Sequence, residues 1–339
     1  MDSTLLRTGP RNAITDVPGL LVGQVEDAAQ MTGVSVVLFA EPAAAAVDVR
    51  GGAPGTRETD LLAPEATVEA VDALVLSGGS AFGLAAADGV MRWLVGRGRG
   101  FPVGDVRVPI VPAAILFDLL VGEKPWRDGT ASPPYAEMGR AACVASGFDV
   151  SMGRVGAGAG ARTAQGWGGV GTASLLLADG TTVGALAAVN AYGSARAAPG
   201  GPFWAAPFEI GREFGGLGPV PPLAALDPDV KGGAPGSKGQ GANTTLVVVA
   251  TDADLSKAQL RRLAVMAQDG LARALVPAHA PLDGDTVFAA STAQRPWRGD
   301  AGVMTALGHA AAACVARAIA RGVWAGMLEE PEAGRGAEA

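Results

Sequence analysis

The sequence predicts an α/β protein in which buried strands are interspersed with helices. Short apolar runs that are rich in β-branched residues and end at turn formers predict strands at residues 34–39, 73–77 and 246–251. Longer segments predict helices at residues 85–94, 255–275 and 304–327, the last of them rich in Ala and suited to close packing. These elements do not alternate with the regular rhythm of a doubly wound sheet.

A β-hairpin is predicted next. Two apolar runs at residues 173–177 and 183–189 flank residues 178–181, where Asp-Gly suits the left-handed positions of a tight turn. Residues 197–242, by contrast, concentrate Gly and Pro and predict a long irregular loop. A long loop inside a compact domain is usually functional or disordered.

The composition excludes several classes of function. The chain has 339 residues, 49% apolar and 17% charged, and we expect one globular domain over residues 1–339. Its net charge of -7 gives no electrostatic basis for binding nucleic acid or an anionic membrane. Two Cys and two His are too few for a disulfide framework or the usual zinc sites, so no metal or cofactor is expected. The first residues lack the apolar core of a secretion signal, which predicts a cytoplasmic protein.

Two familiar catalytic motifs are incomplete. The Gly-rich run at residues 166–171 has the letters of a dinucleotide-binding fingerprint, but it precedes a strand where the fingerprint must follow one. Ser80 lies in a strand-to-helix turn like a nucleophile elbow, but Phe82 occupies the place that requires Gly. His279 lies in a loop with no nucleophile near it in the sequence. A Ser-His-Asp triad is therefore not predicted.

Thr244 stands where the Gly-rich loop ends and a buried strand begins. Self-cleavage to an N-terminal nucleophile requires such a residue: its hydroxyl attacks the preceding carbonyl, the acyl group shifts from nitrogen to oxygen, and water releases it. The new α-amine, with a pKa of about 8, can then act as the base without any His. The alternative is a Thr that merely starts a strand after a Gly-rich turn.

Asp283 and Asp285 form a second candidate feature. Residues two apart point to the same side of an extended segment, so both carboxylates can converge on one pocket, and Gly284 between them permits close approach. Like charges so close raise the pKa of one of the carboxyls, which suits a pair that accepts hydrogen bonds around an amine or a hydroxyl. The alternative is a surface turn or a fragment of a calcium loop.

Three long motifs resemble one known family. They read NAITDVPG at residues 12–19, DVRGGAPGTRETD at residues 48–60 and LSGGSAFGL at residues 76–84. They look like the signature blocks of the L-aminopeptidase/D-esterase family of self-processing peptidases. That family includes β-peptidyl aminopeptidases, the nylon-oligomer hydrolase and a pantetheine hydrolase, and the resemblance covers about residues 12–326. It implies a four-layer αββα sandwich like that of N-terminal-nucleophile hydrolases, with different connectivity, assembled as a homo-oligomer and often a tetramer.

The resemblance also implies how the chain matures and reacts. It makes Thr244 the nucleophile, exposed by cleavage after Asn243 into an α-chain of residues 1–243 and a β-chain of residues 244–339. It assigns to Asn190 the side-chain amide that stabilises the oxyanion.

Four positions are compared with the family pattern. Asp283 and Asp285 match the nylon-oligomer hydrolase branch, whereas the aminopeptidase branch has Ser and Glu there. Gln165 replaces a family Lys that assists the nucleophile, so a cation is lost, and no Lys is near enough in the sequence for a small alignment slip to recover it. Phe117 replaces a Tyr whose hydroxyl helps the oxyanion in some members, so one donor is lost.

The predicted function is that of a self-processing amidohydrolase or aminopeptidase acting on a peptide or small amide. Two other functions stay open. One is an acyl transferase resembling ornithine acetyltransferase, which uses a comparable self-processed Thr. The other is an unprocessed, catalytically impaired scaffold or binding protein, which the loss of Lys at Gln165 motivates.

Overall fold

The long strand β2 (Thr32–Val49) organises the fold by belonging to two sheets. The computed structural model describes residues 7–232 and 243–329. The first half of β2 pairs antiparallel with β1 (Leu20–Asp27) and with β4 (Val71–Ser77). Its second half pairs antiparallel with β13 (Thr286–Arg295). One strand therefore ties the two sheets together.

Each sheet is completed by neighbours of mixed direction. Beyond β13 come β12 (Thr244–Ala253) in parallel, then β11 (Thr182–Asn190) and β10 (Gly169–Leu176), both antiparallel. Beyond β4 come β7 (Ala113–Ile115) in parallel and β3 (Thr56–Arg57) antiparallel. Two small hairpins stand apart, made of β5 (Phe101–Val103) with β6 (Val106–Val108) and β8 (Arg162–Thr163) with β9 (Gly166–Trp167).

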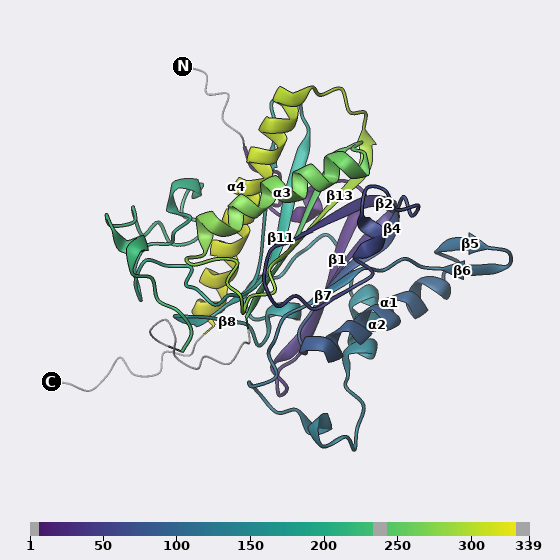
Figure 1. Cartoon of the computed structure of the whole chain (residues 1–339), viewed down its shortest axis with the longest axis horizontal. Helices are drawn as coiled ribbons and strands as arrows, with labels where there is room; N and C mark the ends of the chain where they lie inside the picture. Colours follow the sequence, from purple (N-terminus) through teal and green to yellow (C-terminus); the bar gives the residue numbers. More distant parts are fainter. Residues whose placement is uncertain (1–6, 233–242, 330–339) are drawn as a thin grey trace.

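Three apolar clusters show that the chain stacks in four layers (Figure 1). Helices α3 (Lys257–Ala274) and α4 (Ala301–Leu328) cover the outer face of the sheet that contains β10 to β13. Helices α1 (Ala86–Val95) and α2 (Tyr135–Val144) cover the outer face of the other sheet. A third cluster fills the space between the sheets. The predicted αββα sandwich is confirmed.

Strand β12 shows how the sequence produces this stacking. Every residue of β12 is buried. Leu246 and Val248 point into the cluster between the sheets, whereas Val247 and Val249 point toward α3 and α4. Because successive side chains of a strand alternate between its faces, a strand buried on both faces reads as a continuous apolar run.

The structure extends several predicted elements. The strand predicted at residues 34–39 continues to Val49. Pro42 lies where the pairing register with β4 shifts, and a Pro, which has no N–H, is tolerated where the hydrogen-bond ladder is interrupted. The helix predicted at residues 85–94 begins with a 3₁₀ segment at Ser80–Ala85 before α1. The hairpin, α3 and α4 lie where predicted. The other 3₁₀ segments are Ile14–Asp16, Asp60–Leu62, Pro125–Asp128, Gly156–Gly158, Ala206–Phe208 and Ala224–Leu226.

Helix α4 is long and apolar enough by composition to cross a membrane, but most of it is buried inside the protein.

Helix α4 also packs closely against β10. Gly171 of β10 faces Gly322 of α4, and a Cβ added at Gly171 would meet the backbone of Ala318 and Gly322 well inside van der Waals contact. The absence of side chains at this contact lets the helix and the strand approach at backbone distance.

We expect Gly171→Ala to destabilise the fold by about 1–3 kcal/mol, because the added methyl group meets backbone atoms that cannot move aside independently. Urea unfolding measures the loss. Gly147→Ala is the matched control: nothing lies within 4 Å of a Cβ at Gly147, so its stability should stay within about 0.5 kcal/mol of the wild type. Equal stability of the two variants would show that α4 does not pack on β10 in this way.

Candidate active site

The candidate nucleophile Thr244 is the first residue of β12 and is buried. The antiparallel register of β11 and β12 places it directly opposite Asn190, the last residue of β11. Its hydroxyl donates a hydrogen bond to the carbonyl oxygen of Asn243, the residue that precedes it. Thr245 points to the opposite face of the strand, and its hydroxyl is buried without a hydrogen-bond partner in the described part of the chain. Of the two threonines, Thr244 is the one placed against the preceding peptide group.

The Asn243 carbonyl also accepts a hydrogen bond from the backbone N–H of Gly284, at 3.2 Å. A Cβ added at Gly284 would lie 2.6 Å from the Thr244 hydroxyl oxygen, so only Gly permits the loop to come this close. The close approach predicted for this Gly is therefore present. A backbone N–H in this position can stabilise negative charge that develops on the Asn243 oxygen.

Asp283 is buried and accepts hydrogen bonds with both carboxylate oxygens, from the backbone N–H of Tyr192 at 3.0 Å and of Ala280 at 3.0 Å. Burial and the charge of Asp285 raise the pKa of Asp283 to about 6, against the effect of these hydrogen bonds. The direction of this pKa shift is the one that the sequence predicts for a buried pair of carboxylates.

Asp285 is equally buried and lies on the other side of Gly284. One of its oxygens accepts from the backbone N–H of Thr245 at 2.8 Å. The other accepts from the backbone N–H of His279 and contacts Nδ1 of the same residue, both at 2.9 Å. The two carboxylates therefore face different partners in the intact chain, Asp283 the end of β11 and Asp285 the start of β12.

His279 is a residue whose place the sequence reasoning missed. It lacks a nucleophile nearby in the sequence, yet its ring contacts the carboxylate that holds the residue after Thr244. The only available signal was its spacing of six residues from Asp285, within one loop. His279 adopts a positive φ of 57°, a conformation that the loop geometry imposes and that no sequence pattern indicated.

Asn190 is buried, and its side-chain amide is held at both ends. Its Nδ2 donates to the carbonyl oxygen of Phe117 at 3.1 Å. Its Oδ1 accepts from the backbone N–H of Arg162 at 2.9 Å and from Nζ of Lys231 at 3.2 Å. Phe117 has no hydroxyl to donate, but its main-chain carbonyl accepts the hydrogen bond that orients the Asn190 amide.

Lys231 brings to the site a cation that the sequence reasoning had not placed there. Gln165, which the sequence predicts to replace a family Lys, donates from Nε2 to Asp229 at 2.5 Å. Burial and the charge of Arg162 lower the pKa of Lys231 to about 7, although Asp283 acts in the opposite direction. Lys231 is far from Gln165 in the sequence, so no local spacing could have indicated it.

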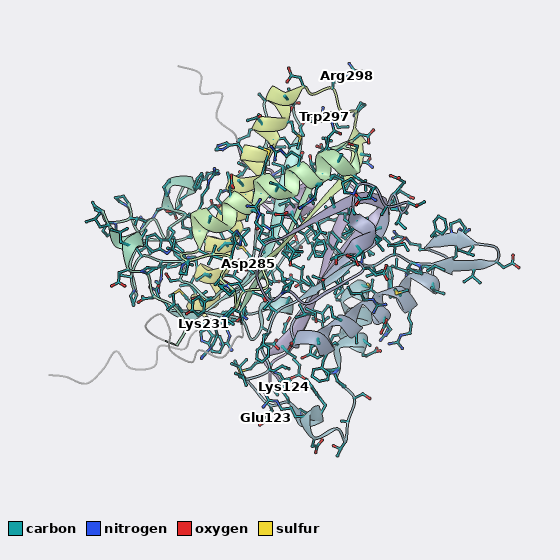
Figure 2. All side chains as sticks on the ribbon, in the orientation of Figure 1. Glu123, Lys124, Lys231, Asp285, Trp297 and Arg298 are labelled. Atoms are coloured by element: carbon teal, nitrogen blue, oxygen red, sulfur yellow. The ribbon has the colours of Figure 1, made fainter. Side chains whose placement is uncertain are left out.

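A cavity of about 260 Å³ opens beside these residues. Asn190 and Lys231 form part of its wall, together with the backbone segment of Phe117. Figure 2 shows Lys231 and Asp285 in one region of the molecule, well separated from Trp297 and Arg298 at the top of the view. The remaining lining residues are Asp118, Leu120, Val121, Gly160 and Arg162.

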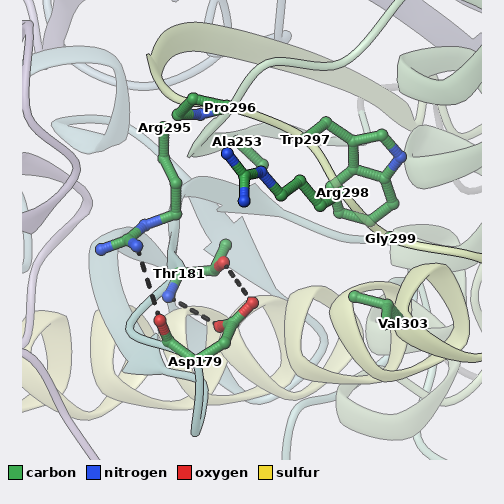
Figure 3. A pocket seen from close by; sticks show the side chains of 9 residues that line it. All are labelled: Asp179, Thr181, Ala253, Arg295, Pro296, Trp297, Arg298, Gly299 and Val303. Atoms are coloured by element: carbon green, nitrogen blue, oxygen red, sulfur yellow. Dashed lines mark hydrogen bonds between the residues drawn. The ribbon is translucent and has the colours of Figure 1, made fainter.

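Trp297 and Arg298 belong to a different cavity, of about 380 Å³ (Figure 3). Arg295 and Asp179 also line it, and the Arg295 guanidinium donates to the Asp179 carbonyl at 3.5 Å. None of the predicted site residues lines this cavity. Among residues 7–232 and 243–329, no group of three or more His, Cys, Asp or Glu is arranged to hold a metal ion.

Comparisons with known proteins show which family the chain resembles over most of its length. The model of peptidase family S58 matches residues 12–334. An uncharacterised aminopeptidase of Mycobacterium tuberculosis is 47% identical over 345 residues, which cover 95% of this chain and 96% of that protein. A 6-aminohexanoate-oligomer endohydrolase of Kocuria is 28% identical and covers 84% of this chain and 76% of its own.

Solved structures match over nearly the whole chain. A β-aminopeptidase of Burkholderia superposes with a TM-score of 0.67 at 26% identity, covering 94% of this chain and 88% of its own. The L-aminopeptidase/D-Ala-esterase/amidase of Ochrobactrum anthropi, described as a variant of the N-terminal-nucleophile hydrolase fold, superposes with a TM-score of 0.68 at 23% identity, covering 95% and 87%. The chain therefore belongs to peptidase family S58, a family of aminopeptidases and amidases, and is a hydrolase.

Proposed function

We propose that this hydrolase activates itself by cleaving the bond between Asn243 and Thr244, and then uses Thr244 as an N-terminal nucleophile on amide substrates. The Thr244 hydroxyl attacks the Asn243 carbonyl carbon, and the acyl group moves from the nitrogen to the oxygen. Water hydrolyses the resulting ester, which leaves a carboxylate on Asn243 and a free α-amine on Thr244. The products are chains of residues 1–243 and 244–339.

One observation carries this proposal. The Thr244 hydroxyl donates a hydrogen bond to the Asn243 carbonyl oxygen, and the backbone N–H of Gly284 donates to the same oxygen. A nucleophile and an electrostatic stabiliser thus meet at one peptide bond. A Thr that merely starts a strand needs neither contact. The buried position of both residues also limits access of bulk water to the reacting group.

In the mature enzyme the new α-amine of Thr244 takes the proton of its own hydroxyl, since its pKa of about 8 suits a base near neutral pH. Asn190, directly opposite in the sheet and in the cavity wall, supplies the amide donor for the oxyanion. Asp285 holds the backbone beside Thr244, and Asp283 holds the end of β11 through Tyr192.

The cavity beside Asn190 and the relatives support a substrate class. A cavity of about 260 Å³ with apolar and polar walls fits a short acyl group rather than a folded protein. One relative is an endohydrolase of 6-aminohexanoate oligomers, and a similar structure is that of a β-aminopeptidase. We therefore propose peptides or small amides as substrates.

Purified wild-type protein should consist of two fragments whose masses meet at the bond between Asn243 and Thr244, whereas Thr244→Ala should remain one chain. Thr244→Ser should still cleave, because it keeps the hydroxyl that attacks the carbonyl. Intact-mass spectrometry distinguishes these outcomes. A wild-type chain that stays whole and is unchanged by Thr244→Ala would instead support the unprocessed scaffold.

Asp285→Ala should slow self-cleavage by about 100-fold, because the backbone at Thr245 loses its anchor and the neighbouring hydroxyl loses its alignment. The fraction of cleaved chain over time, read by mass spectrometry, measures this. Asp252→Ala is the matched control: its buried carboxylate accepts from the Thr182 backbone at 2.8 Å, at the far end of β12. The control should lose stability yet cleave at the wild-type rate, and equal cleavage by both variants would remove Asp285 from the site.

A further inference from the structure

Two donors determine how the Asn190 amide is oriented. The backbone N–H of Arg162 and Nζ of Lys231 both point at one end of the amide, which must therefore be its oxygen. The other end is the nitrogen, and it donates to the Phe117 carbonyl. If the donors to Oδ1 were lost, the amide could rotate and present its oxygen, an acceptor, to a developing oxyanion.

The main chain holds Lys231 at this end of β11. Its backbone N–H donates to the carbonyl of Tyr192 at 2.9 Å. Its Nζ reaches the main-chain carbonyl of Asn190 as well as the side chain, both at 3.2 Å. Gln165 donates to Asp229, two residues before Lys231, at 2.5 Å. The side chain that replaces the family Lys thus binds the segment that carries a different Lys.

The surroundings of Lys231 contain charges of both signs. Asp283 attracts the ammonium group and Arg162 repels it. Asp118 lines the same cavity and is itself buried against Thr32 and the backbone of Gly79. Because burial opposes the charged form, the pKa of Lys231 falls to about 7.

We propose that Lys231 is a positioning residue in self-cleavage as well as in the mature enzyme: its ammonium group holds Oδ1 of Asn190, so that the amide nitrogen is turned toward the carbonyl under attack at Thr244, the residue opposite Asn190 in the sheet. Lys231 thereby supplies, from the loop before the cleavage point, the cation that is missing at Gln165. This inference rests on the proposed function, because it assigns a role in the same reaction. No bond to Lys231 forms or breaks, and no proton leaves it during the step.

Self-cleavage tests the proposal without knowledge of the substrate, since the chain carries its own scissile bond. Lys231→Met keeps an unbranched side chain that is one atom shorter but removes the charge and the donors, and it should slow cleavage by about 100-fold. Lys231→Arg keeps both and should restore cleavage to within about tenfold of the wild type. Fragment appearance over time is followed by intact-mass spectrometry, and thermal unfolding confirms that each variant is folded.

The matched control is Lys257→Met. Lys257, on α3 and away from the site, is buried more deeply than the half-buried Lys231, and its Nζ donates to the carbonyls of Leu61 and Val68 at 3.2 and 2.9 Å. This variant should lose stability but cleave like the wild type. A general cost of removing a buried ammonium group would slow both Met variants equally, and that result would overturn the proposal.

The dependence of cleavage on pH separates positioning from packing. If the ammonium form is required, the wild-type cleavage rate should fall as the pH rises through about 7, because Lys231 then loses its charge. Lys231→Arg should not show this fall, because a guanidinium stays charged. Identical pH profiles for the two proteins would contradict the proposal. A wild-type chain that never cleaves would overturn the proposed function itself, whereas equally fast cleavage by wild type and Lys231→Met would overturn only the role of Lys231.

Discussion

The antiparallel pairing of β11 with β12 is the constraint on which the candidate site depends. It sets Asn190 opposite Thr244, so their side chains lie on the same side of two adjacent strands whose register is held by eight residue pairs. A shift of one residue would turn every side chain of β12 to the other face and would exchange the apolar residues that now fill two separate cores. The packing of the sandwich therefore also specifies the chemistry, because the free energy that stabilises the register stabilises the alignment of the two groups.

The loop of residues 283–285 holds the backbone around the peptide bond between Asn243 and Thr244. Its two carboxylates bind main-chain N–H groups on either side, and the Gly between them brings its own N–H onto the Asn243 carbonyl. These contacts hold the backbone around one peptide bond from both directions. Burying two carboxylates so close together is costly, and the ammonium group of Lys231 offsets part of that cost at Asp283.

Much of this could be predicted from the sequence, because the relevant patterns are local. Continuous apolar runs indicated the strands, and the Asp-Gly-Asp spacing indicated a carboxylate pair around a close contact. The second half of β2 could not be predicted, since its alanines have no strand preference and become a strand only through pairing with β13. His279 and Lys231 were missed because their contacts form only in the folded chain. Lys231 lies 66 positions from Gln165 in the sequence, and no local pattern places it against the Asn190 side chain.

The sequence of the new N-terminus tests the central claim most directly, because two threonines stand side by side at the start of β12. Of these two residues, only Thr244 has a hydroxyl that donates to the carbonyl oxygen of the preceding residue. N-terminal sequencing of the smaller fragment should therefore read Thr-Thr-Leu-Val from residue 244. A fragment that begins at Thr245, or at any residue of the preceding loop, would contradict the proposal that this strand register selects the nucleophile.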